Sequence, residues 1–218
     1  MRIRQEVWTP STHWKTVLSH GELNQSGVVF CFGNPGQHNA QAIYNEVRHS
    51  FPGADLIFGF LDESHEERLY LTAFESDRTE FICDQVSLND LNEDSKEISD
   101  RFEEKKWNGM MMGIDADKNY AAGVIHQLET SFGGSFSQIK TQIPSHRIRL
   151  GLNSMPTYNR AISLATTGNG FSISLSQKKK AASGGAAAAQ TMWDRYAGSI
   201  LSKNEAYTFY FPIAMMSC

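Results

Sequence analysis

Apolar positions in the first quarter of the chain follow two patterns, a continuous run and a helical repeat. Residues 27–32 form a short apolar run, which is typical of a strand covered on both faces. Glycine and proline interrupt it at residues 33–36. A helical repeat follows and must stop at Pro52; its apolar positions are Ala40, Ile43, Tyr44 and Val47. With a second apolar run at residues 55–60, the sequence predicts a βαβ unit with a right-handed crossover.

The same order of patterns occurs again later in the chain. Residues 108–114 predict a buried strand and residues 115–119 a turn, and the helix that follows has an apolar face of Ala121, Val124, Ile125 and Leu128. One constant shift places Ala40 on Ala121 and the helix stop at residues 50–53 on residues 131–134. We therefore expect an internal duplication of about 27–60 and 108–140. Two unrelated βαβ units that look alike are the alternative.

The segment between these units predicts two strands and a helix. Residues 68–74 and 80–86 have strand patterns, and we expect the polar residues 75–78 to join them as a hairpin. Residues 88–106 are charged but keep an apolar stripe, so they predict a surface helix that buries Leu91, Ile98 and Phe102.

The last third of the chain has a different composition. Residues 145–157 are polar and basic, whereas residues 161–176 alternate apolar and polar side chains as a half-buried strand does. The lysine run at residues 178–180 predicts a solvated loop, with anion binding as the alternative. The Gly-Gly pair in the alanine-rich stretch after it predicts a flexible turn that leads into a helix at residues 191–201. We divide the chain into an α/β region at 1–144 and a smaller β-rich region at 145–218. The expected fold class is α/β, with mixed or parallel sheets covered by helices.

The overall composition is that of a globular protein. The 218 residues are 40% hydrophobic and 20% charged, and the formal net charge of −4 offers no basic surface for nucleic acid. The N-terminus has no signal-peptide pattern, and no uncharged apolar stretch reaches the roughly 20 residues that span a bilayer. We therefore expect a cytoplasmic protein that neither binds nucleic acid nor inserts into a membrane.

Candidate catalytic and metal-binding residues are sparse. Cys31 and Cys83 lie in apolar, strand-like stretches, where we expect buried, reduced and unbridged thiols, and Cys218 stands apart from both. The seven histidines lack the spacing of metal ligands, and the glycine motifs of nucleotide-binding loops do not occur. The sequence therefore predicts no metal, no cofactor and no enzymatic activity.

One turn could bind a ligand because it links a strand to a helix. Gly33, Asn34 and Gly36 follow the first apolar run and precede the first helix. Backbone N–H groups at such a position can bind an anion or a carboxylate. An ordinary strand-to-helix turn is the alternative.

Two further segments should lie near this turn. Asp115, Asp117 and Asn119 follow the second buried strand and could bind a cation or an ammonium group, although aspartate is also a common helix N-cap. Gly59 and Asp62 stand at the end of the strand predicted at residues 55–60. Because ligands of open α/β sheets bind at the carboxyl ends of strands, we expect a small polar ligand where these three segments meet.

Six short segments resemble, in their order along the chain, segments of the FIST family of sensory domains. They are residues 51–59, 73–79, 111–119, 168–171, 192–198 and 211–213. The chain differs from the family pattern after Gly59, where Phe60 and Leu61 replace a cysteine and a small polar residue. It also has Ser135 and Phe136 where the family continues a glycine-rich loop.

This resemblance implies a non-catalytic module that senses a small metabolite, such as an amino acid. Because these residues include no recognisable output domain, a separate protein partner would carry the signal. A relict of the fold that serves as a structural or assembly subunit is the main alternative, and a hydrolase with Cys31 as nucleophile is a weaker one.

Overall fold

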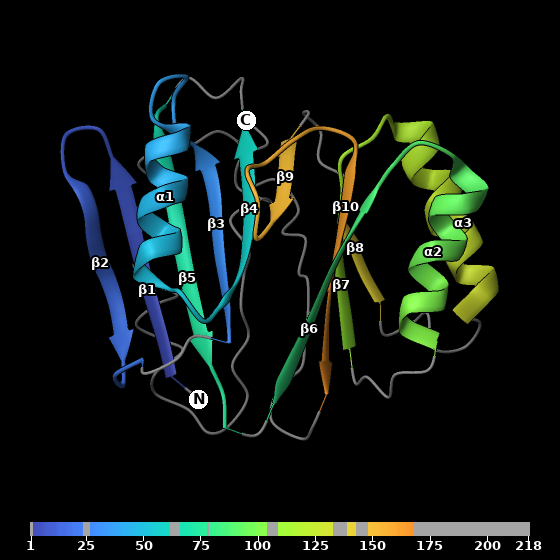
Figure 1. Cartoon of the computed structure of the whole chain (residues 1–218), viewed down its shortest axis with the longest axis horizontal. Coiled ribbons are helices and arrows are strands. Elements are labelled where there is room, and N and C mark those ends of the chain that lie inside the picture. The colour runs from blue at the N-terminus through green and yellow to red at the C-terminus, as the bar shows by residue number, and fades with distance from the viewer. Residues whose placement is uncertain are drawn as a thin grey trace, which may run out of the picture.

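The protein is built from two mixed sheets with helices packed on them, which confirms the α/β class. The computed structural model describes residues 2–23, 27–61, 66–77, 79–103, 109–132, 139–142 and 148–167. Its elements are, in order, β1 (Arg2–Thr9), β2 (His13–His20), β3 (Val28–Asn34), α1 (Ala40–Ser50), β4 (Asp55–Leu61), β5 (Arg68–Glu75), β6 (Glu80–Ser87), α2 (Leu91–Glu103), β7 (Gly109–Ile114), α3 (Lys118–Phe132), β8 (Ile139–Gln142), β9 (Ile148–Leu152) and β10 (Arg160–Thr167). They form a six-stranded sheet, β2-β1-β5-β3-β4-β9, beside a four-stranded sheet, β6-β10-β7-β8 (Figure 1).

The first predicted βαβ unit is present in the six-stranded sheet. β3 and β4 pair in parallel, and α1 lies in front of this sheet in Figure 1, running roughly along its strands. The helix ends where the N–H of Phe51 donates to the carbonyl of Val47, just before Pro52. Its buried side chains are Ala40, Ile43 and Val47, so the predicted helix is confirmed. Of its predicted apolar face, only Tyr44 is partly rather than fully buried.

β3 is buried on both faces, as its continuous apolar run predicts. Cys31 packs on the side of α1, whereas Phe30 and Phe32 pack on the opposite face. The cluster on that opposite face also contains Ile162 and Leu164 of β10, which belongs to the other sheet. We call it the shared cluster, because apolar side chains of both sheets pack within it.

The second βαβ unit lies in the four-stranded sheet. β7 and β8 pair in parallel, and α3 connects them. α2 and α3 pack together against this sheet, and the cluster beneath them buries Ile98, Phe102, Met112, Ile114, Ala121, Val124 and Leu128. Of the face predicted for α3, Ala121, Val124 and Leu128 are therefore buried and Ile125 is partly buried. Ile98 and Phe102 of α2 are buried as predicted, and the side chain of Leu91 lies outside the described part of the chain.

The relation between the two units is less close than the sequence suggested. They lie in separate sheets, and α3 packs beside α2 whereas α1 packs on its sheet without a second described helix. Both units have parallel strands joined by a helix with matching buried positions. A common origin by duplication is not confirmed and stays a prediction.

The predicted hairpin of residues 68–86 is wrong. β5 and β6 are both strands, but β5 pairs with β1 and β3, whereas β6 pairs with β10 in the other sheet. Both edges of β5 are therefore occupied by strands from the N-terminal part of the chain, and β6 must leave this sheet.

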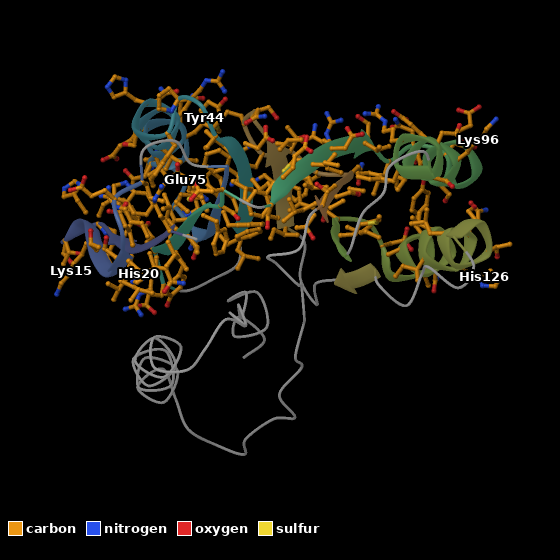
Figure 2. All side chains as sticks on the ribbon, turned by 90° about the horizontal axis from the view of Figure 1, so that it is seen from below. Lys15, His20, Tyr44, Glu75, Lys96 and His126 are labelled. Carbon is orange, nitrogen blue, oxygen red and sulfur yellow. The ribbon has the colours of Figure 1, made fainter. Side chains whose placement is uncertain are left out.

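The N-terminal hairpin of β1 and β2 was not predicted. Among the described strands, β2 forms one edge of the six-stranded sheet. In Figure 2 its Lys15 and His20 lie at the opposite end of the molecule from Lys96 of α2 and His126 of α3.

Residues on both sides of the predicted division at residue 144 share the two sheets. β9 pairs with β4, and β10 pairs with β6 and β7. The remainder of the predicted β-rich region, including the lysine run, lies outside the described residues. None of the described helices is long and apolar enough to cross a membrane.

Candidate functional site

The predicted ligand site lies at the edge where β3, β4 and β7 end. β3 and β4 are parallel neighbours, so their carboxyl ends meet at this edge, at the top of Figure 1. β9 links them to the end of β7, because Ile148 pairs with Leu61 and its N–H donates to Oδ1 of Asp115 at 3.2 Å. The structure thus brings the ends of the three predicted strands to one edge, although β7 belongs to the other sheet.

The turn after β3 is shaped by close backbone contacts. Gly33 has φ of +138°, and a Cβ at this position would lie 2.1 Å from the carbonyl oxygen of Arg68. The N–H of Gly36 donates to Oδ1 of the buried Asn34 at 2.8 Å. α1 begins only at Ala40. The Gly36 N–H that was predicted to bind an anion is therefore used inside the turn.

The structure adds a carboxylate to this turn that the sequence did not indicate. Gly36 has φ of +72°, and a Cβ there would lie 2.5 Å from Oε1 of Glu67. The Glu67 carboxylate therefore lies against the glycine. The signal that the sequence analysis missed is the charged stretch just before β5. Because β5 pairs with β3, and Arg68 at the start of β5 stands opposite Asn34, this stretch lies beside the turn after β3.

Arg68 brings a positive charge to the same edge. Its guanidinium donates to the hydroxyl of Tyr70 at 3.5 Å and forms an ion pair of 2.6 Å with Glu66. The hydrogen bond to Tyr70 is the main cause that raises the pKa of Arg68, and the charge of Glu66 adds to it. Charges of both signs thus stand at the carboxyl end of β3, next to the turn.

Asp115 is a structural residue in this geometry. Asp115 is only 1% exposed. Its two carboxylate oxygens accept the N–H groups of Ile148, at 3.2 Å, and Asn159, at 2.7 Å. Its own N–H donates to the carbonyl of Arg160 at 2.8 Å. The carboxylate predicted to meet a ligand therefore connects β7 to β9 and to the start of β10.

Asp117 and Asn119 serve the start of α3. Oδ1 of Asp117 accepts the N–H groups of Asn119 at 3.0 Å and Tyr120 at 3.1 Å, as an N-cap residue does. This geometry favours the ordinary capping alternative that the sequence left open.

Gly59 makes room for packing between strands. A Cβ there would lie 2.2 Å from the ring of Phe32 and 2.9 Å from the side chain of Ile148. The remaining predicted site residue, Asp62, lies outside the described residues.

The two described cysteines are unbridged, as predicted, but only Cys31 has the predicted burial. Cys31 is 1% exposed, and burial raises the pKa of its thiol. Cys83 is half-buried, and its pKa is raised by burial first and then by the charge of Asp55. Because a thiolate is the reactive form, neither setting suits a nucleophile. Cys218 lies outside the described residues.

Among the described residues, no group of three or more histidine, cysteine or carboxylate side chains is placed to hold a metal ion. Neither a protein-family model nor a curated protein matches the sequence.

Proposed function

We propose that the protein is a non-catalytic, FIST-like sensory module that binds a small polar ligand at the carboxyl ends of β3 and β4. The observation that carries this proposal is the group of charged side chains at that edge. The carboxylate of Glu67 lies against Gly36, and Arg68, the residue opposite Asn34, forms an ion pair with Glu66. An amino acid carries an ammonium group, which Glu67 would bind, and a carboxylate group, which would replace Glu66 in the ion pair with Arg68. A separate protein partner would read the bound state.

The proposed site differs from the set of residues that the sequence indicated. Glu67 takes the role of acceptor, because the oxygens of Asp115 are engaged with backbone N–H groups. Asp117 leaves the proposed site because its carboxylate caps α3, and Asn119 leaves it because this residue lies in the first turn of α3 and donates its N–H to Asp117. Gly33 and Gly36 stay in it as the turn that allows close approach, and Asp62 stays as a predicted neighbour.

Calorimetric titration with a panel of amino acids tests the proposal. We expect binding to the wild-type protein and at least about tenfold weaker binding to Glu67→Gln, since a charge-assisted contact would be lost. Glu46→Gln is the matched control, because Glu46 is an exposed residue on α1, and it should bind like wild type. Equal binding by Glu67→Gln would move the site away from this turn, and a panel without any binder would overturn the proposal.

A structural or assembly subunit is the second candidate function. It is favoured by the internal use of the polar atoms at the edge, above all those of Asn34 and Asp115. A folded protein that binds no amino acid but self-associates in analytical ultracentrifugation would support it. A monomeric protein that binds an amino acid would exclude it.

A further inference from the structure

We draw no further inference here: the strongest candidate, the outer edge of β2 in the described six-stranded sheet, exposes Val17 and carries Lys15 and two histidines, but nothing in the structure shows what covers it.

Discussion

Asp115 shows how one buried carboxylate can connect several chain segments. A buried acceptor with two backbone donors stabilises the fold, and its removal leaves those donors without a partner. Asp115→Ala should therefore lower the free energy of unfolding by about 2–5 kcal/mol, measured by urea denaturation. Asp117→Ala removes only an exposed N-cap and should cost about 1 kcal/mol. Equal losses in the two variants would mean that Asp115 does not connect β7 with β9 and β10 as described.

The role of Asp115 could not be read from the sequence, because its partners are distant. Ile148 and Asn159 lie 33 and 44 positions further along the chain. The rule that ligands bind at strand ends is local, and it correctly predicted that the ends of β3, β4 and β7 lie at one edge. The pairing of β9 and β10 decides which carboxylates at that edge already accept hydrogen bonds from the backbone. The periodicity of a single segment does not contain that information.

Tyr120 and Asp94 form a second polar contact, partly buried, between α3 and α2. The Tyr120 hydroxyl donates to Oδ2 of Asp94, which also accepts the N–H groups of Asn89 and Asp90. Burial, and then the hydrogen bond to Asp94, raises the pKa of Tyr120. The phenol therefore loses its proton less readily in the folded protein than in the unfolded chain, where its pKa is about 10.

This shift predicts a pH dependence with a defined sign. The contribution of Tyr120 to the free energy of unfolding should be complete below about pH 10 and should decrease as the pH rises further. Tyr120→Phe should cost about 1 kcal/mol at neutral pH, and its difference from wild type should shrink in alkaline solution. Urea denaturation of both proteins from about pH 8 to about pH 11 measures this difference. A difference that stays constant would contradict the shift.

At the scale of elements, the two βαβ helices should contribute similarly to stability. Val47 of α1 and Leu128 of α3 are fully buried under their respective sheets. Val47→Ala and Leu128→Ala should each lower the free energy of unfolding by about 2–4 kcal/mol, since each leaves a cavity. Glu46→Ala, at an exposed position of α1, should stay within about 0.5 kcal/mol of wild type. A small loss in either buried variant would mean that its helix is loosely packed.

Elements with clear periodicity were predicted, whereas the N-terminal strand β1 was missed. β3, β4 and α1 have apolar patterns that depend only on local sequence, so their positions were predicted to within a few residues. β1 was missed because its buried positions include Glu6, which bonds to Arg4 and Thr16. A bulge next to Glu6 also breaks the strand's pairing with β2. The two-residue alternation that identifies a strand is therefore absent.

The whole molecule is the scale at which local patterns are least informative. The pairing of β5 with β1 and β3, and of β6 with β10, connects segments that are far apart in the sequence. A short polar turn between two strands favours a hairpin when only the local sequence is considered. The fold is stabilised by the pairing that covers the strand edges, and here that pairing is with strands far away in the sequence. The division at residue 144 was based on composition. Composition does not indicate that β9 belongs to the six-stranded sheet and β10 to the four-stranded sheet.

The shared cluster predicts that the two sheets unfold together. Phe30 and Phe32 of one sheet are buried with Ile162 and Leu164 of the other, so neither sheet can open without exposing this surface. Val47→Ala, a change within the six-stranded sheet only, should therefore speed amide exchange in β7 as well as in β3.

Native-state hydrogen exchange on wild type, Val47→Ala and the control Glu46→Ala measures this coupling. If unfolding is global, a loss of about 2 kcal/mol speeds exchange of the slowest amides roughly 30-fold in both strands. Glu46→Ala should leave both rates unchanged. If Val47→Ala sped exchange in β3 while β7 kept the wild-type rate, the sheets would be independent folding units, and the packing between them would contribute little to stability.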